Sequence, residues 1–311
     1  MFKNKILKPK FWDKSNLSFL SLILLPLTIL TFLINILKKF TIKKKFNIKT
    51  ICVGNIYLGG TGKTPLVIKI NEILRNEFRL FVIKKDYSDQ IDEQELLRNK
   101  TKLIISKSRS KTLAKLNKIK NSVAILDDGL QEKSINYSLS IVCFNSSTGI
   151  GNAKLLPAGP LRENLSELKN YDAVFINGKK NPNLIKKIKI YNEKIRVFSG
   201  QYILKNKKSL NLKFKYLAFA GIGNPENFFS LLKQNNIKIG KTMIFPDHYN
   251  YNSYDINNII KLAKKNNLKI ITSEKDYTKI KKFKKSNINK TVIDLQINEP
   301  KKFKNYLINY L

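Results

Sequence analysis

The chain has 311 residues, of which 42% are hydrophobic, so it can bury a sizeable core and is not a globally disordered protein. It carries 59 Lys and Arg against 22 Asp and Glu, a formal net charge of +37, which attracts nucleic acid, acidic lipid head groups or phosphorylated small molecules. The basic residues are spread along the sequence, so charge alone does not decide the partner. Two cysteines and one histidine argue against a disulfide scaffold and a His/Cys zinc site; they favour a reducing compartment and an oxygen-ligated metal such as Mg²⁺.

The first predicted element is an apolar segment from Ser15 to Leu37 that contains no charged residue. As a helix it would be roughly 35 Å long, enough to cross a hydrocarbon core of ~30 Å. We expect a membrane-associated helix, because the run is too long for a cleaved signal peptide and a buried helix would have to be enclosed on all faces. Lysines flank the segment on both sides and Pro26 would kink it, so a full span and an interfacial or re-entrant helix both remain open.

The next segment predicts a phosphate-binding loop. An apolar strand from Ile48 to Val53 leads into a glycine-rich loop, and Pro65 then opens a helix. Backbone N–H groups of such a loop close around phosphate oxygens, and the helix N-terminus adds its positive end. Lys63 would reach the β- and γ-phosphates and Thr64 would ligate Mg²⁺, although Tyr57 stands where the general pattern has a glycine. The residues expected to hold the nucleotide are Gly59, Gly60, Thr61, Gly62, Lys63 and Thr64.

A second apolar strand, from Asn121 to Leu126, ends in Asp127 and Asp128. An apolar strand that stops on an acid is the Walker-B arrangement, in which the carboxylate lies beside the phosphates and holds Mg²⁺ directly or through water. Paired aspartates at a strand end are sometimes only a turn signal. The phosphate-binding loop upstream, in the same alternation of strand and helix, favours the metal-binding interpretation.

Further strings of residues run through the chain. They are Val53-Gly54-Asn55, Asp127-Asp128-Gly129-Leu130-Gln131, Leu156-Pro157-Ala158-Gly159-Pro160-Leu161-Arg162-Glu163, Gly221-Ile222-Gly223-Asn224-Pro225, Phe245-Pro246-Asp247-His248 and Thr272-Ser273-Glu274-Lys275-Asp276. In this order, and over nearly the whole chain, they resemble the tetraacyldisaccharide 4'-kinase family, the lipid A 4'-kinases. The Leu-Pro-Ala-Gly-Pro-Leu-Arg-Glu string is the most specific of them.

The resemblance implies a kinase of lipopolysaccharide biosynthesis that moves the γ-phosphate of ATP to the 4'-hydroxyl of an acylated, 1-phosphorylated glucosamine disaccharide. It implies ATP and Mg²⁺ as cofactors, and a location at the cytoplasmic face of the inner membrane. The expected partners are ATP, the acylated disaccharide 1-phosphate lipid and the inner-membrane surface, with no nucleic acid. The fold it implies is a P-loop NTPase-like α/β/α domain joined to a smaller α/β domain, with the site in the cleft between them.

The resemblance also assigns roles to single residues. Near the metal it places Thr64, Asp127, Asp128, Gln131 and Glu163. As cations near the γ-phosphate it suggests Arg109 and Arg162, because phosphoryl transfer depends mainly on positioning and charge neutralisation. Besides Lys63, the catalytic residues it implies are His248 and Asp92, which together orient or deprotonate the attacking hydroxyl.

Two stretches depart from the family pattern. Where the family has Ser-Arg-Gly-Tyr-Gly after its second strand, this chain has Lys84-Lys85-Asp86-Tyr87-Ser88, and the segment that follows is shortened. Asp92 is therefore the first choice for the catalytic aspartate, with Asp86 and Asp89 as rivals. The histidine that usually follows Asp-Asp-Gly-x-Gln is Glu132 here. These changes bear on acceptor positioning more than on nucleotide binding.

We predict three parts: an N-terminal membrane-associated helix in residues 1–40, a P-loop domain with a mainly parallel, doubly wound sheet in 41–199, and a smaller α/β domain in 200–311. Residues 200–212 are expected to form a short hairpin linker.

One rival function is a P-loop ATPase or GTPase that switches partner binding. Partitioning ATPases have lysine where this chain has Leu58, and GTPases carry an Asn-Lys-x-Asp string that this chain lacks, so both observations argue against this rival. Another is a relative that binds ATP but no longer transfers phosphate.

Overall fold

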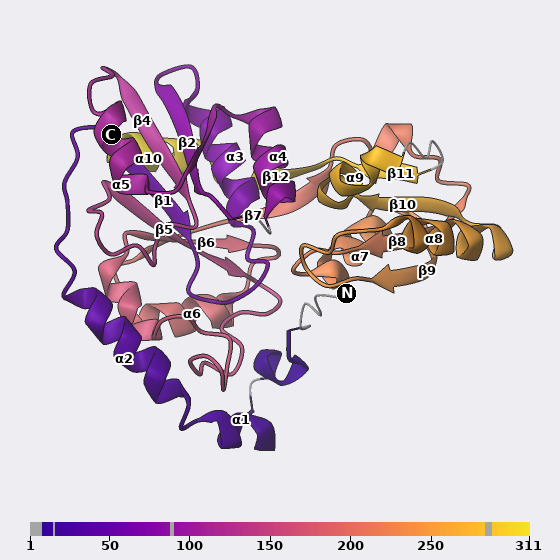
Figure 1. Ribbon diagram of the computed structural model, residues 1–311, viewed down its shortest axis with the longest axis horizontal. Helices are drawn as coiled ribbons and strands as arrows, with labels where there is room; N and C mark the ends of the chain where they lie inside the picture. Colours follow the sequence, from indigo (N-terminus) through magenta and orange to yellow (C-terminus); the bar gives the residue numbers. More distant parts are fainter. Residues whose placement is uncertain (1–7, 15, 88–89, 284–287) are drawn as a thin grey trace. The chain divides into compact units, whose positions relative to one another are not determined.

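The computed structural model describes residues 8–14, 16–87, 90–283 and 288–311. These residues form two compact units (Figure 1). The larger unit comprises residues 8–86, 97–201 and 297–311, and the smaller unit comprises residues 87–96 and 202–296. The boundary predicted at residues 199 and 200 falls inside a continuous strand, Arg196–Leu204, so no hairpin begins at Gly200. The three-part division of the chain stays a prediction.

The larger sheet has eight strands in the order β12-β7-β6-β5-β1-β4-β2-β3. Their bounds are β1 Lys49–Gly54, β2 Arg79–Lys85, β3 Leu103–Ser106, β4 Ser122–Asp127, β5 Leu139–Asn145, β6 Ala173–Asn177, β7 Arg196–Leu204 and β12 Ile293–Ile297. All neighbours from β7 to β3 pair in parallel, which confirms the predicted α/β class. Since parallel strands end at one edge, the loop after β1 and the acid that ends β4 meet there, with Val53 beside Asp127 in register.

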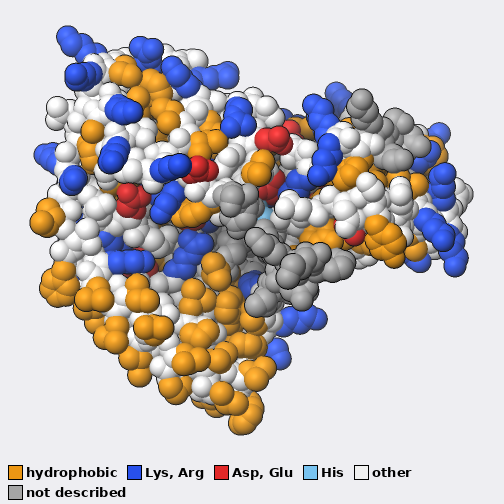
Figure 2. All heavy atoms as spheres, in the orientation of Figure 1, with side chains coloured by type: hydrophobic (Ala, Val, Ile, Leu, Met, Phe, Trp, Pro, Cys, Tyr) orange, Lys and Arg blue, Asp and Glu red, His pale blue; other side chains and the backbone are white. Residues whose placement is uncertain are grey.

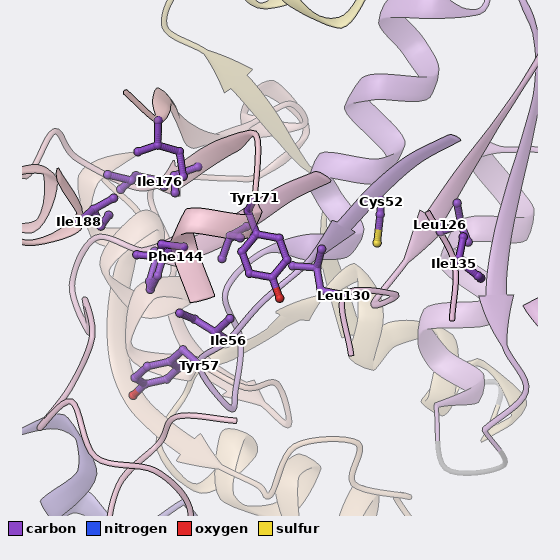
Figure 3. Packing of buried hydrophobic residues seen from close by; sticks show 14 of the residues in the cluster. Cys52, Ile56, Tyr57, Leu126, Leu130, Ile135, Phe144, Tyr171, Ile176 and Ile188 are labelled. Atoms are coloured by element: carbon purple, nitrogen blue, oxygen red, sulfur yellow. The ribbon is translucent and has the colours of Figure 1, made fainter. Parts of the chain in front are cut away.

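Helices cover this sheet and close its core. They are α3 Lys63–Leu74, α5 Arg109–Leu116, α6 Pro182–Tyr191 and α10 Pro300–Ile308, with a 3₁₀ turn η2 at Leu165–Asn170. Helix α4 Ile91–Lys100 is divided between the units, with residues 91–96 in the smaller one and 97–100 in the larger one. In α3 the fully buried Leu66, Ile70 and Leu74 recur every four residues, so one face of the helix packs onto the sheet. Aliphatic and aromatic side chains from β1, β4, β5 and their loops interlock in the cluster of Figure 3.

A 3₁₀ turn η1 at Lys10–Asp13 precedes the N-terminal apolar segment, which forms two short helices, α1 Phe19–Leu24 and α2 Thr28–Lys39. The helices are separated at Pro26, where the sequence predicts a kink. Within the described part of the chain, no helix combines the length and the apolar character that crossing a membrane requires. A single membrane helix is therefore not what the structure shows. Instead, hydrophobic side chains gather on the surface of α1 and α2 (Figure 2).

The smaller unit has its own parallel sheet with helices packed against it. Its four strands have the order β11-β10-β8-β9 and all pair in parallel. Its elements are β8 Lys215–Ala220, α7 Pro225–Gln234, β9 Lys238–Ile244, α8 Ser253–Lys265, β10 Lys269–Ser273, α9 Glu274–Ile280 and β11 Ile288–Thr291, with 3₁₀ turns η3 Lys207–Ser209 and η4 Lys281–Phe283. Along β8, Tyr216 and Ala218 pack with α7 while Leu217 and Phe219 pack with α8, as the period-2 alternation of a strand requires.

Candidate functional site

The loop between β1 and α3 has the backbone conformation expected of a phosphate-binding loop. Gly59 and Gly62 have φ angles of 131° and 84°, which glycine adopts without the strain that other residues would carry. Gly62 is also the residue that precedes the first turn of α3, so the free N–H groups of the helix face the loop. The expected elements, a strand, a glycine-rich loop and a helix, are all present, and helix α3 begins at Lys63 rather than at Pro65.

Three asparagines at strand ends hold the backbone of this loop. Asn55 Nδ2 donates to the carbonyl of Tyr57 at 2.5 Å, and Asn177 Nδ2 donates to the carbonyl of Thr61 at 2.6 Å. Asn145 Nδ2 makes a longer contact of 3.5 Å with the carbonyl of Gly60. Since these carbonyls are occupied by side-chain amides, the loop is fixed with its shape preformed. Tyr57, which replaces a glycine of the general pattern, is buried beneath the loop.

The acid that ends β4 is the centre of this half of the site. Asp127 is fully buried; its Oδ2 accepts a hydrogen bond from Thr64 Oγ1 at 3.2 Å and lies 2.8 Å from Lys84 Nζ. Lys84 is itself 1% exposed, so the ion pair is shielded from water. Lys84 is the first residue of the stretch that departs from the family pattern, and it therefore lies beside Asp127 at the end of the neighbouring strand.

The neighbouring Asp128 is surrounded by cations. Its carboxylate lies 3.6 Å from Lys63 Nζ and 3.1 Å from the guanidinium of Arg162. Burial alone would raise the pKa of Asp128, but Lys63, Arg162 and Lys84 outweigh it and hold the pKa below its usual range. Arg162 also donates to Gln131 Oε1 at 3.2 Å, and Gln131 Nε2 donates to the carbonyl of Asn55. The predicted residues Lys63, Asp128, Gln131 and Arg162 thus form one contiguous group.

The donor set at Asp127 fits a divalent cation. It offers the hydroxyl of Thr64 and a carboxylate whose Oδ1 is buried with no hydrogen-bond partner, and oxygen ligands are those that Mg²⁺ prefers. Within the described residues there is no cluster of three or more His, Cys, Asp or Glu side chains suited to a metal. A Mg²⁺ site completed by substrate phosphates and water does not require one.

Two residues predicted for this site contact protein groups instead. Glu163 Oε2 accepts hydrogen bonds from Lys133 at 3.0 Å and from the hydroxyl of Tyr171 at 2.6 Å. Arg109 is 3% exposed and donates to the backbone carbonyls of Asp127 and Asp128, at 2.7 and 3.0 Å, while its other terminal nitrogen pairs with Glu132. In this arrangement Arg109 braces the end of β4. The metal role of Glu163 and the phosphate role of Arg109 stay predictions.

The smaller unit contains the second group of candidate residues. Asp92 Oδ1 lies 2.8 Å from Nδ1 of His248, and Asp92 is 5% exposed at the start of α4. Of its rivals, Asp86 has an exposed side chain and belongs to the larger unit, and Asp89 lies outside the described residues. The aspartate–histidine pair that the family resemblance implies is therefore present between Asp92 and His248.

Two lysines of α9 flank this pair, and neither was singled out as functional from the sequence. Lys279 Nζ lies 3.0 Å and Lys275 Nζ 3.5 Å from Asp92 Oδ2, since residues four apart share one face of a helix. Burial alone would raise the pKa of Asp92, but the His248 hydrogen bond and the two ammonium groups hold it well below its usual range. Burial would lower the pKa of Lys275, but Glu93, Asp247 and Asp92 raise it.

The start of α9 is anchored by a buried aspartate. Asp276 accepts hydrogen bonds from the backbone N–H of Gly221 at 3.0 Å and from the hydroxyl of Tyr251 at 3.1 Å. It also accepts one from the hydroxyl of Ser273, the residue that caps the helix, at 2.7 Å. Two strings of the sequence, the Gly-x-Gly after β8 and the Thr-Ser-Glu-Lys-Asp after β10, thus meet. Their contact fixes the helix that presents Lys279 to the aspartate–histidine pair.

Comparisons with known proteins decide the family. The sequence profile of LpxK, tetraacyldisaccharide-1-P 4'-kinase, matches residues 20–311. A tetraacyldisaccharide 4'-kinase of Pelagibacter ubique is 46% identical over 310 residues, covering 98% of each chain, and one of Rickettsia canadensis is 34% identical over 316 residues, covering 95% of each. The chain belongs to the tetraacyldisaccharide 4'-kinase family. A crystal structure of LpxK from Aquifex aeolicus shares the fold, with a TM-score of 0.69 and 24% identity over 94% of this chain and 99% of that one.

In this LpxK family member, Lys84 forms a buried ion pair with Asp127, although it lies in a stretch that departs from the family pattern. Lys84→Met removes the ammonium group and keeps most of the bulk, which leaves the carboxylate of Asp127 buried without that partner. Breaking a buried ion pair from one side costs about 3–5 kcal/mol. We expect the free energy of unfolding of the larger unit to fall by about 3 kcal/mol, measured by urea denaturation followed by circular dichroism.

Two variants control this measurement. Lys85→Met, at the next position, should change the free energy of unfolding by less than about 1 kcal/mol. The double variant Lys84→Met/Asp127→Asn should recover much of the loss, because neither charge then remains buried. If the double variant is no more stable than Lys84→Met alone, the ion pair is not what stabilises this edge of the sheet.

The lowered pKa of Asp92 predicts a pH dependence. A carboxyl whose pKa is lower in the folded than in the unfolded chain, where it is ~3.9, stabilises the fold fully above about pH 4, and this stabilisation is lost as the pH falls through the folded value. Asp92→Asn removes the titrating group. We therefore expect the wild type to lose stability relative to Asp92→Asn below about pH 4, measured as urea midpoints of both proteins from pH 7 to pH 3. A difference that stays constant across this range would contradict the assignment.

Proposed function

We propose that this chain transfers the γ-phosphate of ATP to the 4'-hydroxyl of tetraacyldisaccharide 1-phosphate. The observation that supports the proposal is that the phosphate loop leads into a helix whose Lys63 lies beside Asp128 and whose Thr64 lies beside Asp127, in a chain of this family. Its relatives carry the name tetraacyldisaccharide 4'-kinase, and the crystal structure of the Aquifex aeolicus protein is described as a complex with ATP.

The larger unit supplies the nucleotide half of the reaction. The N–H groups of the loop and of the first turn of α3 bind the phosphate oxygens, and Lys63 neutralises the terminal phosphates. Mg²⁺, held by Thr64 and Asp127, would polarise the γ-phosphate when bound. Arg162 forms an ion pair with Asp128 and adds a second cation, besides Lys63, to the nucleotide site. These side chains are positioned before the nucleotide arrives, so little reorganisation is needed as charge develops.

The smaller unit supplies the acceptor half. In the transfer, the acceptor oxygen forms a bond to the γ-phosphorus while the bond from that phosphorus to the bridging oxygen of ADP breaks, and the hydroxyl proton leaves. Asp92, held as an anion by Lys275 and Lys279, accepts a hydrogen bond from the hydroxyl and orients it. A loose transition state requires little help from a base while the bond to the acceptor oxygen is still weak. The hydroxyl proton therefore passes to the Asp92–His248 pair late, as the new bond forms.

We also propose that α1 and α2 dock on the surface of the inner membrane, on its cytoplasmic face, rather than span it. The large apolar side chains most exposed on them are Phe19, Leu30 and Leu37, at 76, 66 and 70%. Lys38 and Lys39 end α2, and three more lysines follow at residues 43–45, which suits anionic head groups. A tetraacylated acceptor stays in the bilayer, so an enzyme that lies on its surface meets the substrate there.

The transfer itself is tested with γ-labelled ATP and tetraacyldisaccharide 1-phosphate in detergent micelles. The wild type should label the lipid, and Lys63→Ala, Asp92→Asn and His248→Ala should each lower kcat/KM, by roughly a hundredfold or more for Lys63→Ala because it removes a charge from the transferred phosphate. Binding of a fluorescent ATP analogue is measured in parallel. A wild type that binds the analogue and labels nothing would favour a nucleotide switch or an inactive relative.

Docking is tested with sedimentation of vesicles that contain phosphatidylglycerol. Phe19→Ser, Leu30→Ser and Leu37→Ser combined should weaken vesicle binding by roughly a thousandfold or more, because each side chain buried in the bilayer contributes about 1.5–3 kcal/mol. Ile190→Ser, at a residue of α6 that is 74% exposed, should leave binding unchanged. Binding that persists in the triple variant would place the membrane-binding surface elsewhere.

A further inference from the structure

The helices that expose apolar side chains also carry polar side chains that point inward. Thr31 Oγ1 donates to the carbonyl of Leu156 at 2.8 Å, and Asn35 Nδ2 donates to the carbonyl of Arg162 at 2.8 Å. Thr31 and Asn35 are four residues apart, so they lie on one face of α2. On other faces of the same helix, Leu30 and Leu37 are exposed.

Two more bonds of the same kind come from η1 and α1. Trp12 Nε1 donates to the carbonyl of Pro157 at 3.0 Å, and the buried Ser21 donates through its hydroxyl to the carbonyl of Ala158 at 2.7 Å. All four acceptors are backbone carbonyls of residues 151–162, which we call the strap. The N-terminal segment therefore holds residues 156–162 of the strap by side-chain donors as well as by apolar packing.

The other side of the strap is bonded to the phosphate loop. The N–H of Arg162 donates to the carbonyl of Ile56 at 2.7 Å, and the N–H of Leu58 donates to the carbonyl of Pro160 at 2.7 Å. From the end of the strap, the guanidinium of Arg162 reaches Asp128. The peptide groups of Arg162 are thus held on two sides, by Asn35 at the carbonyl and by the phosphate loop at the N–H.

We propose that Asn35 and Thr31 are positioning residues of the phosphate site, which act through the strap on Arg162. The position of the backbone determines where the guanidinium lies. A small shift of a cation that faces a phosphate lowers the rate of phosphoryl transfer. The helix with the exposed apolar face thereby takes part in placing a cation of the site. This inference rests on the proposed kinase function, since Arg162 is assigned to the nucleotide there.

A purely structural role for these bonds, in which they only attach α2 to the larger unit, makes different predictions. In that case the loss of either bond would lower thermal stability or vesicle binding. Any effect of that loss on activity would then be the same whether or not the Arg162 guanidinium is present. In a positioning role, the loss acts through Arg162 and disappears when the guanidinium is absent. A double-mutant cycle separates the two, because residues that act as a unit are non-additive.

The cycle consists of wild type, Asn35→Leu, Arg162→Ala and the double variant, assayed for kcat and for the KM of ATP with the lipid acceptor in micelles. We expect Asn35→Leu to lower kcat/KM by roughly tenfold and to add less than about twofold to Arg162→Ala. A wild-type rate in Asn35→Leu, or its full effect in the Arg162→Ala background, would overturn the proposal. Thermal unfolding of each variant verifies that the proteins are folded at the assay temperature.

Thr31 provides a matched pair that does not depend on the fold of the Asn35 variant. Thr31→Val has the same shape without the hydroxyl donor, and Thr31→Ser keeps the donor. The proposal expects Thr31→Val to lower kcat/KM and Thr31→Ser to restore it, with vesicle binding equal in both; equal activity in the pair would overturn it. If the wild type transfers no phosphate, the proposed function fails, and affinity for a fluorescent ATP analogue across the same cycle then decides whether Asn35 acts through Arg162.

Discussion

The burial of a carboxylate at the end of β4 is the constraint on which the nucleotide half of the molecule depends. Asp127 is completely enclosed, and an isolated charge there would cost far more than the fold can supply. Lys84 at the end of β2 and Thr64 at the start of α3 both contact one oxygen of that carboxylate. The strand order places β2 and β1 on either side of β4, so the sheet topology itself brings the cation and the hydroxyl to the acid.

The same edge of the sheet is held by donors to backbone carbonyls. Arg109 binds the carbonyls at the end of β4, and the amide of Asn177 binds the phosphate loop. Each contact gives a backbone carbonyl a side-chain donor, and a buried carbonyl requires a hydrogen-bond partner. The contact of Asn177 therefore helps to fix the shape of the phosphate loop before a nucleotide binds.

The sequence predicted the parts of this arrangement that are local. A strand, glycines, Gly-Lys-Thr and a helix follow one another within a few residues, and so their order alone predicted the loop. Asp127 was predicted because it ends a second apolar strand downstream of that loop. The contributions of Lys84, Asn145 and Asn177 could not be found in that way, because they depend on which strands are neighbours. The family resemblance indicated the Asp92–His248 pair, whereas Lys275 and Lys279 became visible only once α9 was placed.

The N-terminal segment shows where hydropathy is informative and where it stops. An apolar run predicts contact with lipid or core, but it does not distinguish one long helix from two short ones. Proline removes a backbone donor, and the hydroxyls of Ser21 and Thr31 gain carbonyl partners only if the helices lie along the strap. These hydrogen bonds stabilise two short helices that lie against the protein. A segment with polar side chains on one face and leucines on the other is suited to the boundary between protein and lipid.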